Sequence, residues 1–323
     1  MSSTVLGLDT SNYRTSVALV SETGEILLNY RKLLPVPPGE RGLRQNEAVF
    51  AHLRQLSAAE DQLRRAAGGT VAAVAASTAP RDGMDSYMPV FMAGASFGRL
   101  TAAALGVPFV GTTHQRGHLS AAKAGTELEN SEEYLALHLS GGTTDLLEVR
   151  GDSVRQIGGS LDLHAGQLVD RAGVALGCNF PSGPELEKLA EKGQSKGLLG
   201  CSMSSGDLFC HFSGAESQIQ RWIRKESIPR EQIAKEIYDM LARTTARLLC
   251  AGAGETGFRK ALVTGGIASS ELFRSMLQQR ICGKRGAPQV IFGQPEMSGD
   301  NAVGVALIGL NAIRNRSRIN TAG

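Results

Sequence analysis

The second half of the chain opens on Tyr134-Leu135-Ala136-Leu137-His138-Leu139-Ser140-Gly141-Gly142-Thr143-Thr144, an apolar run that ends in a turn of small polar residues. The run predicts a buried strand, and the turn predicts a hairpin with a second strand at 145–150. The chain begins in the same way, because Val5-Leu6-Gly7-Leu8-Asp9-Thr10-Ser11 leads through a polar turn into a strand at 15–20. This recurrence of a hairpin followed by helices suggests two lobes of similar construction.

Helical and strand patterns fill the remainder of both halves. Residues 42–67 have a helical period that turns Val49, Phe50, Leu53, Leu56 and Leu63 inward. A small-residue helix is expected at 86–105, and a strand at 261–263 ends in Gly265-Gly266. The polar, acidic stretch 127–133 marks a lobe boundary. We therefore expect an α/β protein with lobe I at 1–126, lobe II at 127–300, and a C-terminal helix at 301–323 that packs back on lobe I.

The small polar turns predict a nucleotide site. Backbone N–H groups of a tight glycine turn point at one anion and can hold a phosphate. Two such hairpins, followed by a Gly-Gly turn after a later strand, are the arrangement of actin-like and sugar-kinase-like folds. A single turn such as Ser140-Gly141-Gly142 is more often only a hairpin, so the order of the three carries the prediction. Asp9, Thr10 and Ser11 are the candidate first phosphate loop.

His114 and His118 are the candidate metal ligands. Two histidines four residues apart lie on one face of a helix, so both imidazoles can reach one ion. The glutamate that a zinc protease places after its first histidine is replaced by Gln115, which argues against a protease. Asp300 is the candidate third ligand, although taken alone Ser298 or Asp300 is more simply explained as a helix N-cap. Two histidines and a carboxylate suit iron, zinc or manganese.

Composition sets the class of protein and leaves the partner open. The 323 residues suffice for two domains, and the net charge of +3 permits nucleic-acid contact without arguing for it. Five scattered cysteines without a CxxC pair favour reduced thiols in the cytoplasm. The first residues show no secretion signal, and no apolar run is long enough to span a membrane.

Over nearly its whole length the chain resembles the family of tRNA threonylcarbamoyladenosine transferases. No single motif decides this, but their order and spacing together are specific. The residues that carry the resemblance are Gly7-Leu8-Asp9-Thr10-Ser11, His114 with His118, Leu139-Ser140-Gly141-Gly142, Leu168-Val169-Asp170-Arg171, Pro181-Ser182-Gly183-Pro184, Phe212-Ser213-Gly214, Thr264-Gly265-Gly266-Ile267-Ala268 and Ser298-Gly299-Asp300-Asn301-Ala302.

The resemblance implies a fold and an activity. The fold is the two-lobed actin-like, sugar-kinase-like one, built from duplicated ribonuclease-H-like domains with a nucleotide and metal cleft between the lobes. The activity is transfer of a threonylcarbamoyl group from threonylcarbamoyl-AMP to the exocyclic amine of the adenosine beside the anticodon in tRNA. A protein nucleophile is not needed for this step, so we assign no catalytic side chain. Implied partners are tRNA, an inactive paralogue and a partner ATPase.

The resemblance also implies roles for individual residues. His114, His118 and Asp300 would hold one divalent metal, with iron the first choice and zinc or manganese the alternatives. The adenine nucleotide or threonylcarbamoyl-AMP would be bound by a larger set, with Ser270 standing where the family usually has asparagine. That set is His138, Leu139, Ser140, Gly141, Gly142, Asp170, Gly183, Gly265, Gly266 and Ser270.

Several positions depart from the family pattern. Tyr13-Arg14 replaces an acidic pair, Thr143 replaces a histidine, and Arg116 replaces a glutamate between the two metal histidines. These changes predict a more positive site and a divergent branch of the family. Two alternatives therefore stay open: a non-catalytic, nucleotide-binding paralogue that serves as a scaffold for a true transferase, and a small-molecule kinase or carbamoyltransferase on the same fold.

Overall fold

The computed structural model describes residues 3–11, 13–36, 43–83, 87–200, 203, 206–297, 299 and 301–321. The chain divides into two compact units. Unit 1 comprises residues 1–124 together with 299–323, and unit 2 comprises residues 125–298. The C-terminal helix therefore belongs to the unit that the N-terminal strands build.

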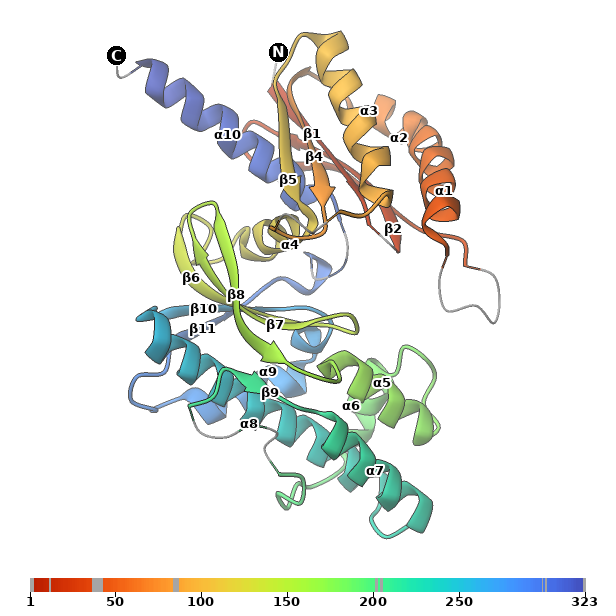
Figure 1. Cartoon of the computed structure of the whole chain (residues 1–323), viewed down its shortest axis with the longest axis vertical. Helices are drawn as coiled ribbons and strands as arrows, with labels where there is room; N and C mark the ends of the chain where they lie inside the picture. Colours follow the sequence, from red (N-terminus) through yellow and green to blue (C-terminus); the bar gives the residue numbers. More distant parts are fainter. Residues whose placement is uncertain are drawn as a thin grey trace. The chain divides into compact units, whose positions relative to one another are not determined.

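Unit 1 is built on a five-stranded sheet with the order β3-β2-β1-β4-β5 (Figure 1). The first three strands form an antiparallel meander, while β4 and β5 run parallel to β1. All of β1 after its first residue is buried, as its run of apolar residues requires. The strands are β1 (Ser3–Thr10), β2 (Arg14–Ser21), β3 (Ile26–Leu33), β4 (Thr70–Ala79) and β5 (Phe109–Thr113).

Helices cover both faces of this sheet (Figure 1). α3 packs on β1 and β4 and against α1, whereas α10 packs on β1, β2, β4 and β5 and against α4. The helices of unit 1 are α1 (Gln45–Ala58), α2 (Glu60–Ala66), α3 (Val90–Leu105), α4 (His114–Lys123) and α10 (Val303–Thr321).

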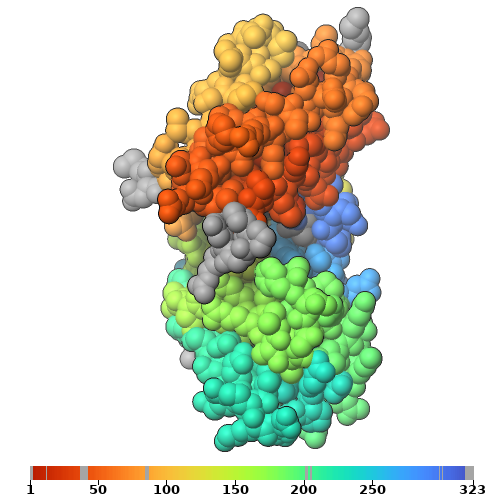
Figure 2. Space-filling model, turned by 90° about the vertical axis from the view of Figure 1, so that its right-hand side faces the viewer, coloured from red at the N-terminus to blue at the C-terminus, as the bar shows by residue number. Residues whose placement is uncertain are grey.

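The helix predicted over 42–67 is two helices, and part of its inward face was predicted wrongly. The chain breaks at Ala59, between α1 and α2. Leu56 is buried, but Phe50 is 56% and Leu53 37% exposed. Phe50 instead carries the Arg54 guanidinium 4.5 Å above its ring and lines a surface groove of about 750 Å³ beside the end of β3. Figure 2 shows the face of unit 1 on which the N-terminal part of the chain, coloured red to orange, is visible. His52 and Gln55 are buried in the inward positions instead, because their side chains hydrogen-bond to backbone carbonyl groups there.

α4 and α10 cross at a pair of glycines. A Cβ built at Gly304 would lie 1.8 Å from the Gly117 carbonyl oxygen and 2.7 Å from the Ala121 nitrogen. A Cβ at Gly117 would lie 3.0 Å from Val305 Cγ2. Only a glycine fits at Gly304, so the backbones approach closely and fix α4 against the C-terminal helix.

Unit 2 repeats the plan of unit 1. Its sheet has the order β11-β10-β6-β7-β8-β9, in which β6–β7–β8 is an antiparallel meander and β10 and β11 run parallel to β6. The order β11-β10-β6-β7-β8 matches β5-β4-β1-β2-β3 strand for strand, and β9 adds an extra edge that the sequence did not predict. The strands are β6 (Glu133–Leu139), β7 (Thr144–Arg150), β8 (Ser153–Ser160), β9 (Phe209–Cys210), β10 (Lys260–Thr264) and β11 (Gln289–Phe292).

The helices of unit 2 surround the long, largely buried α8. This helix packs on β6, β7 and β8 and contacts the helices α5, α6, α7 and α9. The helices are α5 (Ala165–Ala175), α6 (Gly183–Glu191), α7 (Ser213–Lys225), α8 (Arg230–Thr256) and α9 (Glu271–Ile281), with 3-10 turns η1 (Ile267–Ser269) and η2 (Pro295–Met297).

Two expectations about the chain as a whole can be compared with the structure. Among the described residues, no helix is long and apolar enough to cross a membrane. Cys178, Cys210, Cys250 and Cys282 are free thiols, and Cys201 lies outside the described residues.

The glycine crossing gives a first testable prediction. Gly304→Ala should destabilise unit 1 by about 1–3 kcal/mol or more, because the new methyl group overlaps backbone atoms of α4 that cannot move away. The matched control is Gly254→Ala in α8, where a Cβ meets no described atom within 4 Å and alanine should instead stabilise the helix by about 0.5–1 kcal/mol. Chemical denaturation followed by circular dichroism measures both; equal stability of the two variants would contradict the prediction.

Candidate functional site

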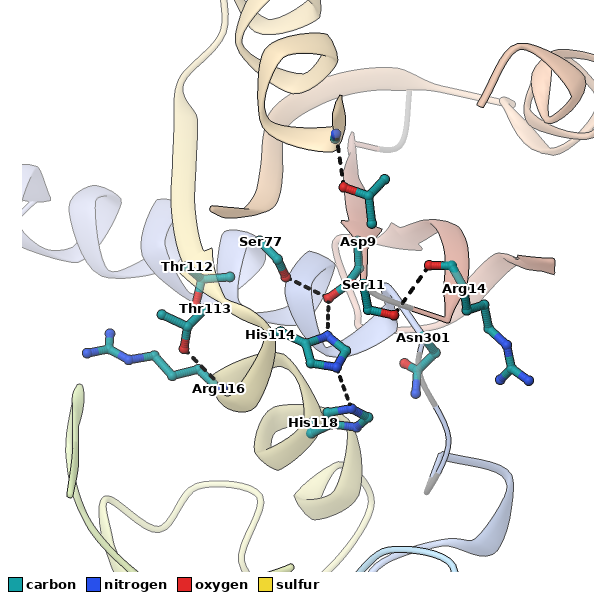
Figure 3. A network of polar contacts seen from close by, with 12 residues as sticks. Asp9, Ser11, Arg14, Ser77, Thr112, Thr113, His114, Arg116, His118 and Asn301 are labelled. Atoms are coloured by element: carbon teal, nitrogen blue, oxygen red, sulfur yellow. Dashed lines mark hydrogen bonds and ion pairs between the residues drawn. The ribbon is translucent and has the colours of Figure 1, made fainter. Parts of the chain in front are cut away.

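The two predicted metal histidines lie at the N-terminal end of α4. Thr113 ends β5 and caps the helix, since its Oγ1 accepts a hydrogen bond from the Arg116 backbone N–H at 3.3 Å. The spacing of four residues brings the His114 and His118 Nε2 atoms within 3.0 Å of each other (Figure 3). The histidine spacing therefore does place both imidazoles on one face of a helix.

Behind His114 lies a buried carboxylate. Asp9 is the penultimate residue of β1, and its Oδ2 accepts hydrogen bonds from His114 Nδ1 at 2.8 Å and from the Ser77 hydroxyl at 2.6 Å. Asp9 is 1% and Ser77 0% exposed. The second oxygen of Asp9, Oδ1, is buried and finds no hydrogen-bond partner among the described residues. The chain thus places a buried acceptor group directly against one side of the His114 ring.

The pair of imidazoles fits a metal ion in its spacing. Two nitrogens bound to one zinc ion at about 2.0–2.1 Å lie about 2.9–3.4 Å apart for bond angles from 90° to the tetrahedral value. The observed separation of 3.0 Å falls in this range. Imidazole nitrogens suit iron and zinc, and a carboxylate behind the first histidine is the usual outer partner of such a ligand.

A complete set of ligands is not found in the described part of the chain. No group of three or more His, Cys, Asp or Glu side chains among the described residues could hold a metal. Asp300, the predicted third ligand, lies outside the described residues, as does Ser298. Its neighbour Asn301 is buried and precedes α10, where its side chain accepts from the Val303 N–H and donates to the Gly299 carbonyl.

The residues of the candidate first phosphate loop make hydrogen bonds that connect elements of unit 1. Thr10 donates to the Val90 carbonyl at 2.8 Å and accepts from the Gly94 N–H at 3.1 Å, which ties β1 to α3. The Ser11 carbonyl lies 2.8 Å from Nε2 of the fully buried His52 of α1, whose Nδ1 lies 2.7 Å from the Thr15 hydroxyl. Burial lowers the pKa of His52, so a neutral ring with Nε2–H donating to Ser11 accounts for both contacts.

The two arginines that depart from the family pattern have different surroundings. Arg116 points away from the histidines (Figure 3), and its Nε and Nη2 each lie 3.0 Å from Asp82 Oδ2. The Asp82 carboxylate offsets the charge of Arg116 locally, and the expectation of a more positive site stays a prediction. Arg14 lies beside Gly299, where a Cβ would be 3.3 Å from Nη1.

In unit 2 the turn after β6 has the form of an anion-binding loop. The Ser140 hydroxyl accepts from the backbone N–H groups of Gly142 at 3.2 Å and Thr143 at 3.1 Å. Serine hydroxyls often close turns by such contacts with the backbone that follows them. Thr143 Oγ1, where the family usually has histidine, also lies 3.2 Å from His138 Nδ1. A Cβ at Gly141 or Gly142 would meet no described atom within 4 Å, so the turn is open to a ligand.

Glycines allow two other segments to approach this turn closely. Gly265 has a φ of +102°, and a Cβ there would lie 2.3 Å from the Leu139 carbonyl oxygen. Gly166, in the first turn of α5, donates its N–H to the Ser140 carbonyl at 3.0 Å. The Ser140–Gly142 turn, the Gly265–Gly266 turn and the start of α5 therefore lie together, while binding of a nucleotide there stays a prediction.

Asp170 and Gly183 meet at the beginning of α6. Asp170 Oδ1 accepts from the Ser182 backbone N–H at 2.8 Å, so the carboxylate anchors the segment that starts this helix. The Gly183 carbonyl accepts from the Tyr238 hydroxyl at 3.2 Å, and burial raises the pKa of Tyr238, which keeps it a donor. Both predicted residues thus lie in one hydrogen-bonded corner.

Glu187 joins the same region, and the sequence analysis missed it. Its Oε1 accepts from the Ser270 hydroxyl at 2.7 Å and from the Leu272 backbone N–H at 2.9 Å. Ser270 also caps α9, because its Oγ accepts from the Phe273 N–H. Glu187 comes one helical turn after Gly183, and this spacing is the signal that could have identified it.

Asp162 is the structural centre of the loop before α5. Its carboxylate accepts from the backbone N–H groups of Leu163, Phe212 and Ser213 and from the Ser213 hydroxyl. Partial burial raises its pKa, but the hydrogen bonds from Ser213, Phe212 and Leu163 outweigh this and lower it to about 2. Asp162 therefore fixes the start of α7 rather than offering a free carboxylate.

Comparison with known proteins decides the family. Residues 46–307 match the family described as TsaD, tRNA N6-adenosine threonylcarbamoyltransferase. The chain belongs to this family. The tRNA N6-adenosine threonylcarbamoyltransferase of Pyrobaculum calidifontis is 30% identical over 96% of this chain and 88% of its own length. That of Methanopyrus kandleri is 28% identical over 94% of this chain and 86% of its own length. The predicted enzyme class, an acyltransferase of this family, is thereby confirmed.

Solved structures agree on the fold of this TsaD family member. HypF of T. kodakarensis superimposes with a TM-score of 0.60 at 14% identity, over 98% of this chain and 48% of its own. A ROK family glucokinase from Streptomyces griseus, solved with glucose and AMPPNP, gives a TM-score of 0.51 at 15% identity over 95% and 99%. The predicted actin-like and sugar-kinase-like fold is confirmed.

The lowered pKa of Asp162 yields a prediction about stability. Ionised Asp162 should contribute about 2 kcal/mol above pH 4, and this contribution should be lost as the pH falls through about 2. Asp162→Asn should therefore lower the free energy of unfolding at pH 7 by about 1–2 kcal/mol, and by about half as much at pH 3. Urea denaturation at the two pH values measures this. Asp152→Asn, an exposed carboxylate in the β7–β8 turn, is the control for the change in charge.

Proposed function

We propose that the chain transfers a threonylcarbamoyl group from threonylcarbamoyl-AMP to the exocyclic amine of the adenosine beside the anticodon of tRNA. Membership of the family supports the reaction class and the acceptor. The observation that carries the metal part of the proposal is the approach of the His114 and His118 Nε2 atoms to 3.0 Å, with the Asp9 carboxylate behind the first ring.

A single divalent ion is proposed to bind to unit 1. His114, His118 and Asp300 would hold it, with iron the first candidate and zinc or manganese the alternatives. When bound, the ion supplies Lewis-acid polarisation of the carbonyl and neutralises negative charge on the departing phosphate. The protein's own contribution is to hold both imidazoles at a fixed spacing on the rigid, glycine-packed helix α4.

Unit 2 is proposed to bind the nucleotide part of the substrate. The open Ser140–Gly142 turn offers backbone N–H groups to a phosphate, in exchange for the Ser140 hydroxyl that they now contact. Asp170 and Gly183 shape the neighbouring corner, and the Glu187 carboxylate, oriented by Ser270 and Leu272, offers an acceptor to ribose hydroxyl groups. The glycine pair at 265–266 lets the later strand approach this turn.

The reaction needs positioning more than a protein nucleophile. The adenosine amine forms a bond to the carbamoyl carbon, the bond between that carbon and the phosphate oxygen breaks, and AMP leaves with the electron pair. The amine loses its proton to water or to the departing AMP. Holding amine and carbonyl in contact turns this into an effectively unimolecular step, and such orientation alone can supply several kcal/mol of the barrier. tRNA is the proposed substrate, with an inactive paralogue and an ATPase as proposed partners.

Removing a histidine tests this proposal. The purified chain is supplied with tRNA, the enzyme that makes threonylcarbamoyl-AMP and the proposed partners, and the modified nucleoside is measured by mass spectrometry. His114→Ala and His118→Ala should each lose the bound metal. Loss of a residue that only hydrogen-bonds a metal ligand costs roughly 10- to 100-fold, and loss of a ligand itself should reduce modification by more than this. His211→Ala, an exposed histidine of unit 2, should retain both properties.

The same experiment separates the alternatives. Nucleotide binding without modification, under conditions in which a housekeeping family member is active, would favour the scaffold paralogue. ATP turnover that does not depend on tRNA would favour a small-molecule kinase or carbamoyltransferase. Full modification by both histidine variants would contradict the metal part of the proposal.

A further inference from the structure

The two oxygens of the Asp9 carboxylate have different surroundings, and a purely structural carboxylate would not need this difference. One oxygen, Oδ2, accepts two short hydrogen bonds, from Ser77 at 2.6 Å and from His114 at 2.8 Å. The other oxygen is buried without a hydrogen-bond partner among the described residues. Burying a carboxylate with an unsatisfied oxygen costs free energy, so this arrangement calls for a compensating role.

The contacts assign the tautomer of His114. A carboxylate can only accept, so the proton of the neutral ring lies on Nδ1 and the lone pair lies on Nε2. His118 Nε2, 3.0 Å away, then donates its N–H to that lone pair. A free histidine has no such constraint, and the alternative tautomer would turn an N–H of His114 toward His118.

Other residues hold the ring and the carboxylate in place. Ser77 of β4 is fully buried, and its hydroxyl fixes the Asp9 oxygen that His114 contacts (Figure 3). Phe91 of α3 lies against the His114 ring, with a centroid distance of 5.8 Å. Three elements of unit 1, β1, β4 and α3, therefore determine the orientation of one imidazole of α4.

We infer that Asp9, held by Ser77, is a positioning residue that selects the His114 tautomer whose Nε2 lone pair faces His118. This inference rests on the proposed function for its purpose: a neutral imidazole with its lone pair directed at the ion is what metal binding requires, and the carboxylate behind it raises the basicity of the ligand. Asp9 is not itself a ligand of the same ion, because it lies against the opposite nitrogen of the ring.

The tautomer can be read without any metal. In the metal-free full chain labelled with ¹⁵N-histidine, two-bond ¹H–¹⁵N spectra at pH 8 report which nitrogen of His114 carries the proton. The wild type should show Nδ1–H. Asp9→Ala should shift His114 toward the Nε2–H tautomer, whereas Asp9→Asn, which retains an oxygen acceptor without the charge, should keep Nδ1–H. Thermal melting identifies any variant that fails to fold, and Asp9→Asn and Ser77→Ala are the milder variants.

Metal titration supplies the second readout. Asp9→Ala should bind Zn²⁺ or Mn²⁺ about 10- to 100-fold more weakly than the wild type, with Asp9→Asn and Ser77→Ala between them. Asp61→Asn is the matched control, since it removes an exposed carboxylate of unit 1, on α2, and should leave tautomer and affinity unchanged.

The outcomes separate this inference from the proposed function. An Nε2–H tautomer in the wild type, or a tautomer that survives Asp9→Ala, would overturn the inference whatever the metal does. Nδ1–H in the wild type that is lost in Asp9→Ala, together with no metal binding by the wild type, would uphold the tautomer assignment and refute the metal site of the proposed function.

Discussion

Hydrogen bonds from the last residues of β1 tie three helices of unit 1 to its sheet. Asp9 contacts α4 through His114, Thr10 contacts α3 through Val90 and Gly94, and the Ser11 carbonyl contacts α1 through His52. Each of these partners is buried or partly buried, where a lost hydrogen bond leaves an unsatisfied group that costs about 1–3 kcal/mol. The position of His114 therefore depends on the end of a single strand, which holds it through the Asp9 side chain.

Duplication of the sheet explains why the two units can carry different chemistry. Both units have an antiparallel meander followed by two parallel strands in the same order, and in both the first strand of the meander runs into a polar turn. In unit 1 the side chains of Asp9 and Thr10, just before the turn, are buried and hydrogen-bonded to α4 and α3. In unit 2 the Ser140–Gly142 turn keeps open glycines. The same backbone plan thus provides a structural anchor in unit 1 and an open glycine turn in unit 2.

The sequence predicted the features that depend on local spacing. The hairpins, the histidine helix and the two-lobed fold follow from apolar runs, glycine turns and a four-residue interval, all of which are short-range patterns. The inward face of 42–67 was predicted wrongly, because the apolar period favoured Phe50 and Leu53 while buried hydrogen bonds selected His52 and Gln55. Ser77 could not be predicted, since its partner Asp9 is 68 positions away. The spacing from Gly183 could have identified Glu187, but not its contact with Ser270, which is 83 positions away.

A departure from the family pattern can be explained physically once the residue that contacts the changed side chain is considered. Taken alone, Arg116 between two metal histidines adds a positive charge that would repel a cation. Its guanidinium instead lies against Asp82, on the side of α4 away from the histidines, because a position two residues after His114 faces the opposite side of a helix. The change of a glutamate to arginine is therefore matched by an acidic residue in the loop after β4, while the carboxylate that contacts His114 is the buried Asp9. Charge changes in this family should accordingly be judged as pairs in space rather than as single substitutions in a motif.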